Sequence, residues 1–172
     1  MIRWCTERDI ERINAVVNAA AEAYRDVIPA DRWKEPYMPL DELCREIASG
    51  VAFLGYAERR TLLGVMGLQD LGEVALIRHA YVQPSAQRRG IGGALVTELK
   101  RRSPRPMLVG TWAAAAWAIR FYEAHGFALV EPEQKDALLR AYWSIPERQI
   151  ETSVVLADPR WFAAQQPDAG PA

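Results

Sequence analysis

The chain has 172 residues, half of them hydrophobic and a quarter charged, so it suits a globular domain with a full core. Its formal net charge of −1 excludes a global attraction to nucleic acids or anionic membranes, and we expect neither as a partner. No Gly-x-Ser-x-Gly motif occurs, which argues against a serine hydrolase.

Cysteine and histidine usage indicates a reducing compartment and no metal. Cys5 and Cys44 lie far apart and in no paired motif, so we expect no disulfide framework. His79 and His125 lack metal-ligand spacing, so we expect no metal cofactor. The chain begins without a long apolar run, and no stretch approaches a membrane span. The sequence therefore predicts a soluble, cytoplasmic protein.

Apolar periodicity predicts the elements of the first half of the chain. A short strand precedes a helix that Thr6 caps and Pro29 ends. An irregular segment with aromatic residues and prolines, 28–39, leads to a second helix, and Gly50 closes that helix. Three strands then follow as hairpins. In order, the first strand, the second helix and the three later strands cover residues 2–5, 40–49, 51–57, 62–68 and 73–82.

The second half continues the alternation of helices and strands. A helix ends at Arg102, where cationic side chains suit the helix dipole. We then expect a strand over 107–111, a helix over 113–124, a strand over 127–130, a helix over 135–142 and a strand over 152–156. Trp161 and Phe162 are expected to fold back on the body. Residues 1–162 should form a single domain, and 163–172, which lack periodicity, a mobile tail.

The turn after the strand 73–82 carries the first chemical signal. Residues Gln87 to Gly93 include three glycines and enter a helix directly. Such a turn aims free backbone N–H groups and the positive end of the helix dipole at one point, which suits a phosphate. Glycine lets the anion approach the backbone. Leu95 stands at the third glycine of the dinucleotide fingerprint, and no P-loop Gly-Lys-Ser/Thr follows, so neither motif fits. A plain helix cap is the alternative.

Two motifs carry a family resemblance. Gln87, Gly90 and Gly92 form Gln-x-x-Gly-x-Gly directly after a strand, and Phe-Tyr-Glu-x-x-Gly-Phe occupies 121–127. In this order and spacing they resemble the acyl-CoA loop and the later helix and strand of the GNAT family of N-acetyltransferases, with the resemblance covering 2–157. The resemblance implies an α+β fold with a mixed, mostly antiparallel central sheet of six to seven strands flanked by helices. It also implies an enzyme that transfers an acetyl group from acetyl-CoA to a primary amine of a small molecule or amino acid by direct attack on the thioester.

The resemblance also implies roles for individual residues. Tyr122 takes the position of a general acid beside the thioester sulfur, although an aromatic residue that only packs the helix on the sheet would look the same. A backbone N–H near Tyr81 or Val82 would bind the thioester carbonyl, because this strand is splayed from the next in the family. The Arg88 and Arg89 side chains either reach a phosphate or point to solvent. The pyrophosphate would bind the backbone of Gln87, Arg88, Arg89, Gly90, Ile91, Gly92 and Gly93.

The resemblance does not supply a general base. The base positions of some family members correspond to Leu76 and Arg78, and neither is a base at neutral pH. His79 is one residue out of phase, so a period of two places it on the opposite face of the strand, and we interpret it as structural. Glu73, near the start of the strand, is a weak base candidate. A chain of waters would leave no trace in the sequence.

A second departure from the family leaves another function open. Ala115 replaces an Asn that often contacts the cofactor, and Trp112 or Trp117 could reshape the same wall. Together with the missing base, this allows a catalytically silent acyl-CoA-binding or interaction module on the same fold. The acceptor pocket would come from segments 28–39 and 143–148, which do not identify the amine. A homodimer is compatible with the sequence.

Overall fold

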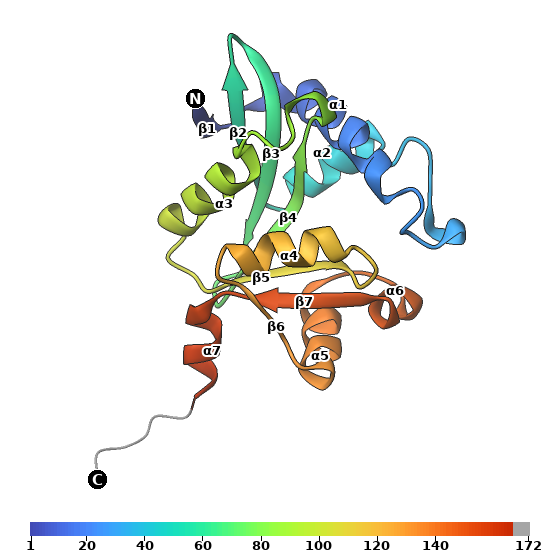
Figure 1. The fold of residues 1–172 in the computed structure, drawn as a ribbon, viewed down its shortest axis with the longest axis vertical. Helices are drawn as coiled ribbons and strands as arrows, with labels where there is room; N and C mark the ends of the chain where they lie inside the picture. Colours follow the sequence, from blue (N-terminus) through green and yellow to red (C-terminus); the bar gives the residue numbers. More distant parts are fainter. Residues whose placement is uncertain (167–172) are drawn as a thin grey trace.

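A seven-stranded sheet with the strand order β1-β2-β3-β4-β5-β7-β6 organises the computed structural model, which describes residues 1–166 (Figure 1). Its neighbouring strands are antiparallel except β4 and β5, which are parallel. The strands are β1 Ile2–Trp4, β2 Val51–Glu58, β3 Thr61–Asp70, β4 Ala75–Val82, β5 Met107–Trp112, β6 Ala128–Leu129 and β7 Ser153–Ala157. The helices are α1 Ile10–Ala21, α2 Leu40–Ala48, α3 Ile91–Arg102, α4 Ala116–Ala124, α5 Pro132–Tyr142, α6 Glu147–Glu151 and α7 Pro159–Gln165.

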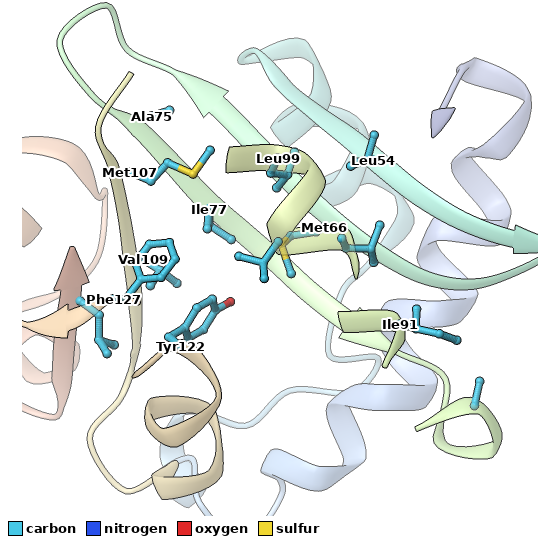
Figure 2. Packing of buried hydrophobic residues seen from close by; sticks show 14 residues of the cluster. Leu54, Met66, Ala75, Ile77, Ile91, Leu99, Met107, Val109, Tyr122 and Phe127 are labelled. Carbon is cyan, nitrogen blue, oxygen red and sulfur yellow. The ribbon is translucent and has the colours of Figure 1, made fainter. Parts of the chain in front are cut away.

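Helices cover both faces of the sheet. On one face α3 and α4 pack against the strands, and Ile77, Leu99 and Tyr122 belong to one buried apolar cluster (Figure 2). On the other face α1 and α2 cover β2 and β3, while α5 and α6 cover β5 and β7. The alternation of strand side chains decides which residue faces which layer: Ala75 and Ile77 face α3, and Leu76 between them faces α5. This mixed, mostly antiparallel sheet flanked by helices confirms the predicted fold class.

The structure differs from the prediction in the start of one helix and in a short helix that was not predicted. The helix predicted over 113–124 begins only at Ala116, because the Ala113 N–H donates to the Thr152 carbonyl at 2.8 Å and extends the strand-like contact between β5 and β7. The sequence analysis also missed α6. Five residues are too few to show a helical period.

The C-terminal segment is helical further than predicted. Asp158, which is fully buried, caps α7 by accepting the Trp161 N–H at 3.2 Å, and the Trp161 ring is buried as expected. α7 continues to Gln165, so the tail predicted to be mobile from residue 163 starts as a helix. The rest of that tail, 167–172, lies outside the described residues. Between residues 1 and 166 no helix has the length and apolar character needed to cross a bilayer.

Candidate active site

The glycine-bearing turn forms the entry to α3. The Gln87 side chain closes the turn by donating from Nε2 to the Val82 carbonyl at 3.3 Å. Arg88 and Gly90 both have positive φ, at 59° and 76°, so the backbone reverses sharply before the helix. The Ala94 N–H donates to the Gly90 carbonyl at 2.9 Å as the first turn of the helix closes. The N–H groups just before Ala94 belong to that first turn and are directed outward, as a site for an anion requires.

Gly92 and Gly93 are also required by the packing of α3 against α4. A Cβ on Gly92 would lie 3.2 Å from the Phe121 ring, and one on Gly93 would lie 2.8 Å from Nε2 of His125. The His125 ring is held by its Nδ1, which lies 2.7 Å from the Phe121 carbonyl oxygen. Both glycines therefore allow α3 to approach α4 closely. Only Gly90 is required by backbone conformation.

The structure distinguishes between the two arginine side chains of the turn. Arg89 donates from Nη2 to both carboxylate oxygens of Glu58 at the end of β2, at 2.7 and 2.9 Å. Arg88 is exposed and lies in the left-handed region. The Arg89 guanidinium thus pairs with the end of β2, and any phosphate contact from it would require this ion pair to open.

A gap separates the ends of β4 and β5. Their pairing covers 75–77 with 107–109 and stops there, although both strands continue. A bulge at His79, where φ is 52°, bends β4 at this point. The Gln83 N–H donates to Leu63 of β3, so strand alternation directs the Val82 N–H away from β3 and into the gap. Of the two predicted carbonyl donors, Val82 has its N–H in the gap, whereas Tyr81 pairs with Val65.

A cavity of about 190 Å³ occupies this gap. The segments predicted to form the acceptor pocket contribute Tyr37 and Trp143 to its wall. Among the described residues that line it, none is Asp or Glu, and the charged or ionisable groups are Arg78, His79 and tyrosine hydroxyls. Its aromatic lining consists of Tyr24, Tyr37, Tyr81, Trp112, Tyr122 and Trp143.

The sequence left two roles open for Tyr122, a packing residue and a general acid, and its position in the structure suits both. Its ring packs edge-on against Phe121 and Phe127, with centroid distances of 5.0 and 5.6 Å, and lies beside Val109 (Figure 2). Its side chain also lines the cavity, and among residues 1–166 its hydroxyl has no hydrogen-bond partner. Burial, and after it the neighbouring Tyr24, raises the pKa of Tyr122 well above its ordinary value. The phenol is therefore protonated at neutral pH and free to donate a hydrogen bond into the cavity.

Tyr24 and Tyr37 lie outside both sequence motifs and also line the cavity. The Tyr81 hydroxyl donates to the Tyr37 hydroxyl at 3.1 Å. The Tyr24 ring lies between Tyr81 and Trp117, at centroid distances of 6.2 and 5.1 Å, and burial raises the pKa of Tyr24 to about 12. The sequence analysis gave Tyr24 no role, because it belongs to neither motif.

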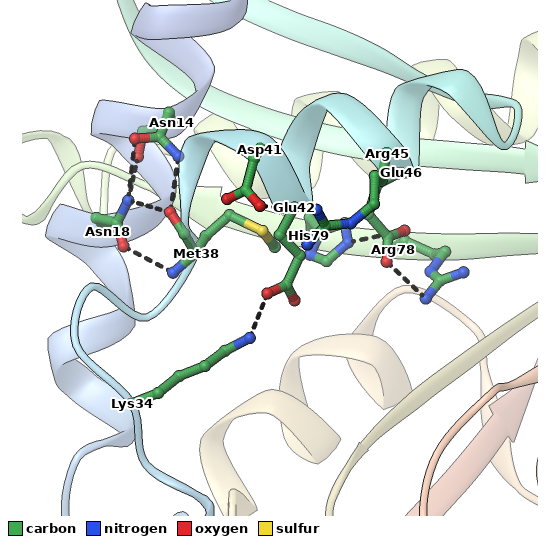
Figure 3. Close-up of polar contacts among 10 residues, drawn as sticks. All are labelled: Asn14, Asn18, Lys34, Met38, Asp41, Glu42, Arg45, Glu46, Arg78 and His79. Carbon is green, nitrogen blue, oxygen red and sulfur yellow. Dashed lines mark hydrogen bonds and ion pairs between the residues drawn. The ribbon is translucent and has the colours of Figure 1, made fainter.

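The segment that carries Tyr37 is fixed to α1 by a pair of asparagines. Asn14 and Asn18 donate from Nδ2 to the Met38 carbonyl at 2.8 and 3.0 Å, and Asn18 Oδ1 accepts the Met38 N–H at 2.9 Å (Figure 3). Both backbone groups of Met38 are therefore satisfied by side chains of one helix. These hydrogen bonds hold the neighbouring Tyr37 at the cavity, and no sequence motif predicted them.

The prediction that His79 lies on the opposite face of β4 from Arg78 is wrong, because of the bulge. Strict alternation would put His79 opposite Arg78, but both side chains meet Glu46 of α2, each at 3.4 Å (Figure 3). The extra residue of the bulge brings two successive side chains to one face. The His79 ring also stacks on Phe53, which supports its structural interpretation. His79, and after it Arg78, lowers the pKa of the Glu46 carboxyl.

The structure does not bring Glu73 to this site. Glu73 is exposed in the turn between β3 and β4, at the opposite end of β4 from Val82, and it does not line the cavity. Ala115 is completely buried at the start of α4. Trp112 lines the cavity directly, whereas Trp117 reaches it only through its contact with Tyr24.

Comparison with known proteins decides the family. A family model described as an acetyltransferase (GNAT) domain matches residues 11–142. The chain belongs to the GNAT acetyltransferase family. It is also 31% identical over 88 residues to the peptidyl-lysine N-acetyltransferase YiaC of Escherichia coli K12. That match covers 51% of this chain and 60% of YiaC, so the chain spans less than two thirds of this curated relative.

Solved GNAT structures share the fold at low sequence identity. The PaiA N-acetyltransferase of Thermoplasma acidophilum, in complex with coenzyme A, is 16% identical with a TM-score of 0.65, covering 92% of this chain and 97% of that one. The ribosomal-protein-S18-alanine N-acetyltransferase of Escherichia coli has the same identity and TM-score, with coverage of 100% and 98%. YncA of Salmonella typhimurium, with acetyl-CoA, is 22% identical with a TM-score of 0.58, covering 76% and 80%.

Proposed function

We propose that this protein is an acetyl-CoA-dependent N-acetyltransferase that acts on a primary amine, such as that of a small molecule or amino acid. One observation carries the proposal: Tyr122, whose hydroxyl has no hydrogen-bond partner among residues 1–166, lines a cavity that opens where β4 and β5 separate. Family membership and the coenzyme A and acetyl-CoA in the PaiA and YncA structures support the choice of donor.

The α3 N-terminus and the free edge of β4 fit the charge and the extended shape of an acyl-CoA. Residues 77–81 of β4 line the cavity itself, whereas the α3 N-terminus lies outside the set of described lining residues. The α3 N-terminus offers backbone N–H groups from Gly90 to Gly93 for the pyrophosphate. Beyond Ile77, β4 keeps β3 on one side only, so its free edge can bond the amides of an extended pantetheine arm. The Val82 N–H in the gap would bind the thioester carbonyl and stabilise the negative charge that develops there.

The reaction itself needs one proton moved from nitrogen to sulfur. The amine nitrogen bonds to the carbonyl carbon, the carbon–sulfur bond breaks, the nitrogen loses a proton and the sulfur gains one. Tyr122 would donate to the departing sulfur. A phenol with a raised pKa is a weaker acid than a thiol of pKa about 8.5, so Tyr122 acts first as a hydrogen-bond donor to the developing thiolate.

A Tyr122→Phe variant tests this assignment by removing only the hydroxyl. We expect thiol release from acetyl-CoA in the presence of an amine to slow by more than about tenfold, as for loss of a general acid. Affinity for acetyl-CoA, measured by calorimetric titration, should change little. Tyr142→Phe is the matched control, because Tyr142 packs in the α5 cluster and does not line the cavity. An unchanged rate in Tyr122→Phe would remove Tyr122 from the reaction.

A catalytically silent acyl-CoA-binding module is the second candidate. It is favoured by the lack of a carboxylate among the described lining residues and by the distant position of Glu73. This candidate predicts saturable acetyl-CoA binding without thiol release for any amine. Thiol release with one amine is enough to decide between the two.

A further inference from the structure

The size of the cavity limits what part of an acceptor can enter. A volume of about 190 Å³ is below the roughly 300–1,000 Å³ of pockets that enclose a drug-sized ligand. Under the proposed function, the reacting thioester end must share this space with the amine. Only a slim arm that carries the amine fits inside, while the remainder of the acceptor stays outside.

The charges around the cavity disfavour a second cation on that arm. Arg78 lines the wall, and its guanidinium donates to Gln69 at 3.0 Å and meets Glu46 at 3.4 Å, so Glu46 is already engaged. Carboxylates of the bordering segments are paired as well, although these pairs are exposed: Asp31 with Arg148, Glu35 with Arg25, and Glu42 with Lys34. A second ammonium would lose its hydration without gaining a carboxylate partner.

The aromatic walls suit a single amine on an apolar arm. Six aromatic side chains line the cavity, and their faces can hold an alkyl or aromatic stem. One ammonium over such rings gains roughly 0.5–2 kcal/mol from cation–π attraction. Burial and the nearby Arg78 also favour the neutral amine, which is the nucleophilic form. A cavity with no carboxylate among its described lining residues can therefore still deliver a reactive amine.

We propose that the acceptor is a primary amine on an unbranched apolar or aromatic arm without a second positive charge, and that polycationic amines are poor substrates. This inference rests on the proposed N-acetyltransferase function. Two sources share this chemistry, a free monoamine and the side chain of a lysine within a peptide.

An acceptor panel on the wild-type protein tests the inference through thiol release from acetyl-CoA. The amines are 2-phenylethylamine, Nα-acetyl-lysine amide, spermidine and kanamycin. We expect kcat/KM for one of the first two to exceed that of both polycations by at least about tenfold, the effect of leaving a buried charge unpaired. The faster of the first two identifies the source.

A carboxylate added to the cavity wall should shift the preference from monoamines toward polycationic amines. Gln149 lines the cavity and has a neutral side chain, so Gln149→Glu should raise spermidine turnover relative to 2-phenylethylamine by about tenfold. Gln134→Glu adds the same charge at an exposed position of α5, outside the cavity, and should leave the ratio unchanged. Thermal melting checks that both variants fold.

The outcomes distinguish a wrong acceptor class from a wrong N-acetyltransferase function. Spermidine or kanamycin as the best wild-type acceptor, or an unchanged ratio in a folded Gln149→Glu variant, would overturn the acceptor class and leave the enzyme standing. Acetyl-CoA binding without thiol release from any of the four amines would overturn the proposed function, and the acceptor inference with it.

Discussion

Gly93→Ala should destabilise the protein, although alanine is the better helix former. In an open helix position this exchange would stabilise by about 1 kcal/mol. Here the new Cβ would lie 2.8 Å from Nε2 of His125, a distance that real Cβ atoms essentially never show. The imidazole is not free to swing aside, because Nδ1 is bonded to the Phe121 carbonyl at 2.7 Å and the ring packs against the Phe121 ring.

The expected magnitude follows from these opposing terms. Separating the helices or breaking the imidazole hydrogen bond costs roughly 2–3 kcal/mol. After the gain in helix propensity, the free energy of unfolding should fall by about 1–2 kcal/mol. For a chain of this length that corresponds to roughly 2–8 °C in Tm.

A double-mutant cycle is the sharpest assay. Urea unfolding of the wild type, Gly93→Ala, His125→Ala and the double variant gives the coupling between the two positions. Once His125 is removed, Gly93→Ala should be neutral or stabilising, with a coupling of about 2 kcal/mol. A higher Tm for Gly93→Ala in the wild-type background would refute the reasoning, because it would show that α3 and α4 are not held at this close distance.

The remaining predictions concern the loop, acid stability and thiol chemistry. Gly90→Ala should weaken acetyl-CoA binding about five- to thirtyfold in calorimetric titration, since a left-handed L-residue costs about 1–2 kcal/mol; undiminished affinity would contradict the loop assignment. Arg3 holds the pKa of the buried Asp9 carboxyl well below its usual value, so this contribution is present above an unfolded-state pKa of about 3.9 and lost as pH falls below it. In urea unfolding between pH 7 and 3, the stability gap between the wild type and Asp9→Asn should therefore narrow below about pH 4. Iodoacetamide should modify the exposed Cys44 before Cys5, whose thiol pKa burial raises to about 11, as peptide mass mapping would show.

The parts of the site that depend on neighbouring residues were predictable from the sequence. The turn from Gln87 to Gly93 forms as expected, because a glycine at positive φ and a following apolar helix pattern are local properties. The succession of strands along the chain and the position of Tyr122 on α4 were predictable for the same reason. The short helix α6 was not predicted, because five residues carry too little periodicity.

The tertiary structure decided everything that depends on contacts between distant segments. A bulge in β4 moved His79 onto the face of Arg78, against the period of two, because the register with β3 is set by a partner strand and not by the local pattern. Tyr24 meets Tyr81 only because α1 packs across the sheet beside β4. Glu73 lies away from the cavity because it precedes β4, at the opposite end of that strand from Val82. Local periodicity and turn chemistry thus determined which elements form, and the long-range packing of those elements determined which side chains share the cavity.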